Sequence, residues 1–266
     1  MELLTNDKVN APRGRCHGDE LILFCMPYIR HFLKKHQDLV LIEIGSERKK
    51  KKGGSTHQLA MISRKRGWQF ITVDADDAAS RIAGAIVKSI DPVFEAHHRL
   101  GEEFLKEYSK NNIGICYLDA FDIVTEGSRQ EIIIKTYERR HVAMTNQAAY
   151  AMHYAAAVHI VDKIIPGGFI CFDDVWLDKH AVWQGKGKTA IPLLLSRGYK
   201  IIEYTPNALL LQNLNGLDIK VLASGTAKKK WILLGLKILR RRVMTAPVLI
   251  KGLVQRRITR GIYGQK

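Results

Sequence analysis

Short runs that are apolar nearly throughout alternate along the chain with longer stretches of helical periodicity. The apolar runs LVLIEIG, WQFITVDA, GICYLDA and GGFICFDD lie at 39–45, 68–75, 114–120 and 167–174. Strands of this composition are typical of a parallel sheet with helices on both faces. A short run at 92–96 predicts one more strand, and helical stretches lie at 55–66, about 77–90, 99–110, 131–163 and 187–197. The pattern therefore predicts an α/β fold.

Two further patterns flank this alternation. Apolar side chains at helical spacing predict a helix over 19–37, which Pro27 is expected to kink or divide. The runs 199–204 and 208–213 are joined by a short turn, so these two strands pair antiparallel or lie close together. We therefore expect three parts: an N-terminal helical extension at 1–38, a sheet domain at 39–215 and a C-terminal tail at 216–266.

The positive charge of the chain is concentrated in that tail. The net charge is +16 over 266 residues, and twelve Lys or Arg residues with no acidic residue lie between Lys228 and Lys266. Subtracting these twelve from +16 leaves +4 for residues 1–227, which is close to the charge of an ordinary enzyme surface. A nucleic-acid-binding function for the whole protein is therefore not indicated by the net charge.

The tail also carries an apolar stripe between its basic side chains. The stripe is formed at helical spacing by Leu249, Ile250, Leu253, Val254 and Ile258. A segment of this kind binds an anionic membrane surface or a partner, packs on the body of the protein, or binds RNA. We favour contact with a membrane surface, near lipid-linked or cell-envelope glycan acceptors, over contact with nucleic acid.

The sequence predicts a cytoplasmic protein, with peripheral contact at the inner membrane surface through residues 228–266. The N-terminus lacks the apolar run and cleavage site of a signal peptide, and no stretch reaches the roughly 18–20 apolar residues of a membrane span. The four cysteines have no metal-ligand spacing, and Cys116 and Cys171 fall within apolar runs, as expected in a reducing compartment. Formation of a homo-oligomer is left open.

Glycines and hydroxyls follow the first predicted strand, at the edge where ligands bind in open α/β sheets. Gly45 allows a tight turn, and Gly53-Gly54 allow the backbone to approach a ligand closely. Ser55 and Thr56 stand at a predicted helix start, where free N–H groups and hydroxyls favour an anionic group. Glu43 is expected to face the same edge and to favour a positive group. A ligand with one carboxylate and one ammonium, such as an amino acid, meets both demands.

An acid at the end of the second strand adds a second demand on the ligand. Asp74 stands where a carboxylate binds the two hydroxyls of a ribose. A ribose joined to an amino acid suggests S-adenosylmethionine. The dinucleotide fingerprint GxGxxG is absent, and the loop lacks the order of a phosphate-binding GxxxxGK[ST] motif. The stretch GKGKT at 185–189 has valine at position 182, where that motif needs its first glycine.

Four stretches together resemble a known family: EIGS…GGST (43–56), ITVDAD (71–76), ICYLDAFD (115–122) and IIPGGFICFDDVW (164–176). They resemble the class I, Rossmann-like, S-adenosylmethionine-dependent methyltransferases, more narrowly the macrocin-type sugar O-methyltransferases and more distantly catechol O-methyltransferase. The resemblance implies a mostly parallel seven-stranded sheet with an antiparallel C-terminal hairpin. It implies that the cofactor is bound by Glu43, Gly45, Ser46, Gly53, Gly54, Ser55, Thr56, Asp74, Glu95, Ala96 and Asp119.

The loop after the first strand departs from the family pattern. It is several residues longer than usual, and Lys49–Lys52 fill it. These lysines either form a solvated loop or attract an acidic substrate or the cofactor carboxylate.

Three acids end two strands that are expected to be neighbours. Asp119 follows one strand, and Asp173 and Asp174 follow the next. Such a cluster repels itself unless it is protonated or bound to a hard cation, and oxygen ligands of this kind suit Mg²⁺. The resemblance likewise matches these three positions to the metal ligands of the metal-dependent O-methyltransferases. Alternatively, Asp173 and Asp174 only cap the turn that follows.

Methyl transfer to a hydroxyl also needs a group that takes up the proton. The family resemblance does not transfer this role, because Asp122 stands where the catechol enzymes carry a lysine. Asp119, Asp122 and His141 are the candidate catalytic residues, with His180 as a further candidate base.

The leading hypothesis is an O-methyltransferase acting on a small hydroxylated acceptor, with a sugar or glycan preferred over a phenol. An RNA methyltransferase and a non-catalytic Rossmann-like membrane or protein-binding scaffold are the alternatives.

Overall fold

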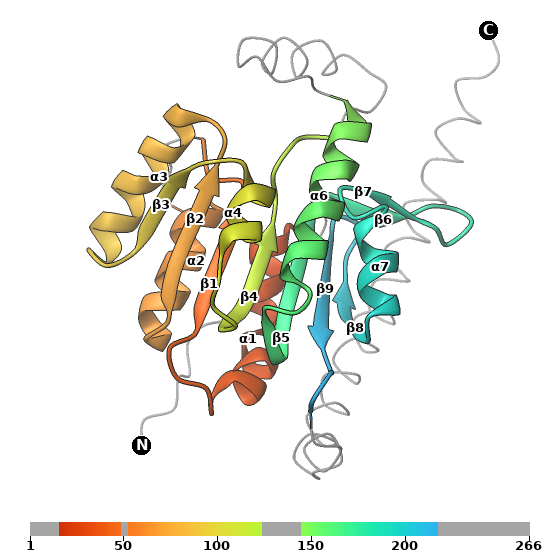
Figure 1. Ribbon diagram of the computed structural model, residues 1–266, viewed down its shortest axis with the longest axis horizontal. Helices are drawn as coiled ribbons and strands as arrows, with labels where there is room; N and C mark the ends of the chain where they lie inside the picture. Colours follow the sequence, from red (N-terminus) through yellow and green to blue (C-terminus); the bar gives the residue numbers. More distant parts are fainter. Residues whose placement is uncertain (1–15, 49–52, 124–144, 218–266) are drawn as a thin grey trace, which may run out of the picture. The chain divides into compact units, whose positions relative to one another are not determined.

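Seven strands form one sheet in the computed structural model of the protein, which describes residues 16–48, 53–123 and 145–217 (Figure 1). The strand order is β3-β2-β1-β4-β5-β9-β8. The strands are β1 (Val40–Ile44), β2 (Gln69–Asp74), β3 (Glu95–His98), β4 (Ile113–Leu118), β5 (Ile164–Asp173), β8 (Tyr199–Tyr204) and β9 (Ala208–Asn213). Strands β1 to β5 run parallel, whereas β9 pairs antiparallel with both β5 and β8. The expected mostly parallel seven-stranded sheet with an antiparallel hairpin is confirmed.

Helices cover both faces of this sheet. On one face lie α1 (Gly18–Leu33), α2 (Ser55–Arg66) and α3 (Asp77–Ile90), and on the other α4 (Gly101–Glu107), α6 (Asn146–Ile160) and α7 (Ala190–Ser196) (Figure 1). Successive side chains of a strand point to opposite faces, so both faces of the central strands are apolar. In β5, Ile170 and Phe172 pack in the core on the α6 face, while Phe169 contacts Tyr28 of α1. This two-sided burial explains why the central strands are apolar nearly throughout.

Most elements lie close to their predicted ranges, and the differences have local causes. Helix α1 ends at Leu33, because the polar residues after it offer nothing to bury, and Pro27 lies on its exposed side without ending it. The third strand is β3 at Glu95–His98, and the helix predicted at 99–110 is α4, which ends at Glu107. A second, two-stranded sheet was not predicted. It consists of β6 (Val175–Leu177) and β7 (Trp183–Gly185), which pair antiparallel.

Some sequence predictions lie outside the described residues. These are Lys49–Lys52, residues 131–144 of the predicted helix at 131–163, His141 and the basic tail at 228–266. Within the described ranges, no helix combines the length and apolar composition needed to cross a bilayer.

Candidate active site

An open cavity lies where β1, β2 and β4 end, with about 630 Å³ of empty space including its mouth. Apolar walls come from Ile44, Val73, Leu100, Phe121 and Met152. Charged side chains of both signs also line it, namely Arg48, Asp74, Asp76 and Glu102. The cavity therefore combines an apolar interior with a few charged groups, as a nucleoside with a charged tail requires.

The turn after β1 brings two strand ends into close contact. Gly45 has a φ of +94°, and a Cβ there would lie 2.5 Å from the backbone nitrogen of Ala120 and 2.6 Å from the carbonyl carbon of Asp119. Both the conformation and the space therefore require glycine. The backbone N–H of Asp119 donates to the Ile44 carbonyl at 2.8 Å, which fixes the end of β4 beside that of β1.

Two backbone N–H groups hold the Asp74 carboxylate at the cavity. The N–H of Ser46 donates to Asp74 Oδ2 at 2.8 Å, and the N–H of Asp76 donates to Oδ1 at 2.7 Å. Burial raises the pKa of Asp74, and these two hydrogen bonds oppose the rise. Each carboxylate oxygen can accept more than one hydrogen bond, so Asp74 can still accept hydroxyl groups from a ligand.

Glu43, predicted to pair with a positive ligand group, is instead fully buried among hydroxyls. Ser55 Oγ donates to its Oε1 at 2.8 Å, and Thr56 Oγ1 and Thr72 Oγ1 donate to its Oε2 at 2.7 Å each. This network joins β1 and β2 to the start of α2. Burial raises the pKa of Glu43 to about 8, and the three hydroxyl donors oppose the rise. Glu43, Ser55 and Thr56 therefore bind one another next to the cavity, and none of them lines it.

The raised pKa of Glu43 makes a prediction about stability. The folded protein holds this proton more tightly than the unfolded chain, so the free energy of unfolding falls as pH rises from about 4.5 towards 8. At about 1.4 kcal/mol per pKa unit, the rise from 4.5 to about 8 limits the fall to about 5 kcal/mol. Glu43→Gln cannot ionise and is expected to flatten this dependence. Urea unfolding of both proteins across this pH range measures it, and parallel curves for the two would contradict the prediction.

The remaining loop positions and the predicted adenine contacts lie elsewhere. Gly54 is the N-cap of α2, and neither it nor Gly53 lines the cavity. Glu95 and Ala96 pair with Ile71 and Thr72 in β2, so they lie before the carboxyl end of β3 and away from the cavity. Neither residue lines the cavity, because β3 extends to His98. The cavity wall after β3 is formed by Leu100, Gly101 and Glu102.

The three predicted acids at the ends of β4 and β5 meet, and a lysine joins two of them. The ammonium of Lys186 lies 2.6 Å from Asp119 Oδ1 and 3.0 Å from Asp174 Oδ2, and it donates to the Asp119 carbonyl at 3.2 Å. Lys186 is only 1% exposed. The acids around it raise its pKa far above the ordinary value against the opposing effect of burial, so the side chain is a cation. Burial raises the pKa of Asp119 to about 7, and Lys186 opposes that rise.

Backbone geometry explains how Lys186 reaches this cluster. Asp174 has a φ of +47°, which turns the chain from β5 into β6, and the β6–β7 hairpin returns it to the same point. Gly185, with a φ of +77°, ends the hairpin, and a Cβ there would lie 1.9 Å from the Asp174 carbonyl oxygen. The N–H of Lys186 then donates to that carbonyl at 3.1 Å. Aspartate is one of the few non-glycine residues that adopt left-handed backbone readily.

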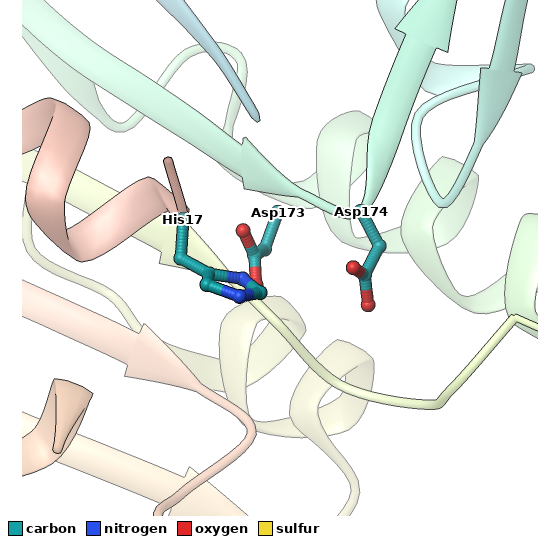
Figure 2. A group of neighbouring side chains, drawn as sticks. All are labelled: His17, Asp173 and Asp174. Atoms are coloured by element: carbon teal, nitrogen blue, oxygen red, sulfur yellow. The ribbon is translucent and has the colours of Figure 1, made fainter. Parts of the chain in front are cut away.

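The third acid, Asp173, is held from the opposite side by the start of α1. His17 Nδ1 lies 3.1 Å from Asp173 Oδ2, and the N–H of Gly18 donates to Oδ1 at 2.8 Å. The hydrogen bond to Asp173 raises the pKa of His17 to about 9. Figure 2 shows His17, Asp173 and Asp174 side by side, and their potential ligand atoms lie within 4.8 Å of one another. Neither His17 nor Lys186 was predicted as a site residue.

The other candidate bases lie outside this cluster or outside the described residues. Asp122 pairs with Arg48 at 3.1 Å, next to the cavity that Arg48 lines. His180 is exposed, in the loop between β6 and β7. His141 is not among the described residues. Asp119 is therefore the candidate base that the structure brings into the carboxylate cluster.

No protein-family model matches the sequence. A search of curated proteins finds no match either. Solved structures of methyltransferases are similar in fold. They include the DszA carbon methyltransferase (11% identity, TM-score 0.43, covering 75% of this chain and 53% of that one).

A second is the 16S rRNA N2 G1207 methyltransferase RsmC of T. thermophilus in complex with AdoMet and guanosine (15% identity, TM-score 0.45, covering 76% of this chain and 44% of that one). A third is MycE of the mycinamycin biosynthetic pathway in complex with Mg and SAH (17% identity, TM-score 0.43, covering 73% of this chain and 52% of that one). The chain spans about half the length of these three proteins.

Proposed function

We propose that this protein is an S-adenosylmethionine-dependent methyltransferase that methylates a hydroxyl of a small acceptor, with a sugar or glycan preferred over a phenol. The observation that carries the proposal is Asp74, held by two backbone N–H groups at the edge of an apolar cavity. A carboxylate in this position suits the two hydroxyls of a ribose, and ligands of open α/β sheets bind at this edge.

The other parts of the cavity suit the two ends of the same cofactor. Leu100 and Phe121 offer apolar surface to the adenine, with Glu102 beside them. Arg48, which follows β1, also lines the cavity and offers a guanidinium to the carboxylate of the methionine moiety. The bound cofactor supplies an electrophilic methyl group on a sulfonium. The protein has to hold an acceptor hydroxyl in line with that methyl group and take up its proton.

Asp119 is placed to take up that proton. It follows β4 directly beside the Gly45 turn, and the next residue, Ala120, lines the cavity. A pKa near 7 suits a general base at neutral pH. Lys186 holds Oδ1, and among the described residues no donor reaches Oδ2. We therefore assign Oδ2 the role of accepting the proton from the acceptor hydroxyl.

Protein groups already compensate the three acids, which disfavours the Mg²⁺ site that the sequence predicts. Mg²⁺ needs carboxylate oxygens that accept an ion at about 2.0–2.1 Å. Lys186 already contacts Asp119 and Asp174, and His17 and the Gly18 N–H already contact Asp173.

Isothermal titration calorimetry tests the proposed function. S-adenosylhomocysteine is expected to bind one site with a dissociation constant in the micromolar range, whereas NAD gives no heat of binding at the same concentration. Equal binding of both compounds, or binding of NAD alone, would refute the methyltransferase assignment. Nucleotide sugars, free sugars and catechols, incubated with S-adenosylmethionine and followed by mass spectrometry, then identify the acceptor class.

Membrane contact through residues 228–266 is a separate part of the proposal, supported by the basic and apolar composition of that segment. Each Lys or Arg near an anionic surface contributes about 1 kcal/mol to binding. The full chain is therefore expected to float with vesicles that contain phosphatidylglycerol, and a chain without residues 228–266 is expected to remain at the bottom of the gradient. Equal flotation of the two proteins removes this part of the proposal. Vesicles of phosphatidylcholine alone serve as the control.

A further inference from the structure

The ammonium of Lys186 is completely enclosed by the cluster. Its three contacts are Asp119 Oδ1, the Asp119 carbonyl and Asp174 Oδ2, at 2.6, 3.2 and 3.0 Å. Two of its three donors form hydrogen bonds with Asp119, and Asp174 forms an ion pair with it at 3.0 Å. Lys186 is therefore held in place as a charged group, and its ammonium has no lone pair with which to act as a base.

The ammonium of Lys186 lies between two carboxylates that come from neighbouring strands. Asp119 ends β4 and Asp174 follows β5, and these neighbouring strands place two carboxylates on one edge of the sheet. Without a cation between them the two carboxylates would repel each other. A divalent metal ion provides that cation in many oxygen-ligand sites. Here the chain provides it, through a hairpin that begins at Asp174 and ends at Gly185.

We propose that Lys186 is the built-in cation of this site, which holds Asp119 and Asp174 where a divalent metal ion would otherwise be needed, so that methyl transfer requires no metal. This inference rests on the proposed methyltransferase function. Lys186 is a positioning residue: it orients Asp119 and keeps Oδ2 of that residue turned to the acceptor. His17 has the same role on Asp173, so each of the three acids has a counter-ion from the protein.

Binding of Mn²⁺, followed by the electron paramagnetic resonance signal of the free ion, tests the proposal without an acceptor. The wild-type protein is expected to leave the signal of free Mn²⁺ unchanged. Lys186→Met removes the ammonium and leaves two uncompensated carboxylates, so this variant is expected to bind Mn²⁺ at least ~10-fold more tightly than the wild type. Lys188→Met is the matched control, because Lys188 is an exposed cation two residues away that lies over the Tyr150 ring.

Activity gives a second readout on any acceptor that the wild type methylates. Wild-type turnover is expected to be unchanged by EDTA and by added Mg²⁺. Lys186→Met is expected to lose about 100-fold in kcat with little change in S-adenosylhomocysteine affinity, and to recover part of this loss when Mg²⁺ is added. A merely structural lysine predicts no gain of Mn²⁺ binding and no recovery by Mg²⁺.

Either of two results overturns the proposal: tight Mn²⁺ binding by the wild type, or wild-type turnover that EDTA abolishes and Mg²⁺ restores. Both use the wild-type protein, so they remain decisive if Lys186→Met does not fold. If the proposed methyltransferase function is wrong, S-adenosylhomocysteine does not bind at all, so this failure can be distinguished from failure of the Lys186 proposal. The Mn²⁺ measurement still decides whether Lys186 is the cation of the cluster.

Discussion

Asp74→Asn is expected to weaken binding of S-adenosylhomocysteine by at least ~100-fold. The substitution removes the negative charge that would accept the two ribose hydroxyls, and hydrogen bonds to a charged group are worth about 1.5–3 kcal/mol each. Asparagine can also accept only one of the two backbone N–H bonds that Asp74 now receives, from Ser46 and Asp76. Its amide group would face the other N–H donor, which turns the side chain out of position.

Asp77→Asn is the control for this measurement. Asp77 is an acid three residues further on, at the start of α3, and forms an exposed pair with Arg81 at 2.6 Å. Its loss changes the local charge equally but is expected to alter affinity by less than about 3-fold, because an exposed helix pair contributes only about 0.3–0.5 kcal/mol. Calorimetry measures both variants. Unchanged affinity of Asp74→Asn would show that the cofactor ribose does not lie at Asp74.

Asp119→Asn is expected to reduce kcat by at least ~1,000-fold while S-adenosylhomocysteine affinity stays within about 3-fold of the wild type. Asparagine keeps the shape of the side chain and can still accept a hydrogen bond from Lys186, but it cannot take up a proton. The cavity walls and Asp74 are unaffected by the substitution, so cofactor binding is preserved.

The comparison with Asp122→Asn decides which acid is the base. Asp122 is half-exposed and pairs with Arg48, so its loss is expected to affect cofactor affinity through Arg48 more than turnover. Stopped turnover in Asp122→Asn, with normal turnover in Asp119→Asn, would reverse the assignment. Single-turnover assays with enzyme in excess of S-adenosylmethionine separate the chemical step from product release.

The strands and the meeting of the acids were predictable because they follow from short-range patterns. An apolar run such as 39–45 predicts a strand buried on both faces, and carboxyl ends of neighbouring parallel strands lie at one edge. Asp119, Asp173 and Asp174 therefore come together as the sequence predicts. The same reasoning placed Gly45 and Asp74 at the cavity that the structure shows.

Predictions failed where a contact depends on the path of the chain between elements. The strands β6 and β7 have only three residues each, which is too short for a periodic pattern. The sequence therefore did not predict the hairpin that brings Lys186 into contact with Asp174. The stretch GKGKT at 185–189 resembles part of a phosphate-binding loop, which does not point to a role beside carboxylates. The available signal was its Gly-Lys pair, shortly after two acids that needed a cation. His17 is equally remote, because it lies 156 residues from Asp173 in the sequence.

Glu43 shows a different limit. Its place at the end of β1 was predicted, but the sequence does not tell whether a carboxylate faces the solvent edge or the adjoining helix. The register of β1 with β2 pairs Glu43 with Thr72, which turns both side chains towards α2 and its hydroxyls. A carboxylate in that environment holds β1, β2 and α2 together through its hydrogen bonds.

Helix α1 sets a practical limit on how far the polypeptide can be shortened. A recombinant fragment that starts at Leu39 would retain every strand of the main sheet. It would also uncover the apolar side chains of β5 and β9 and lose the hydrogen bond between Tyr28 and Gln212. Asp173 would lose both of its donors at the same time. Such a fragment is expected to aggregate on purification, and a trimmed version for crystallisation should keep His17 and everything from there to Asn213.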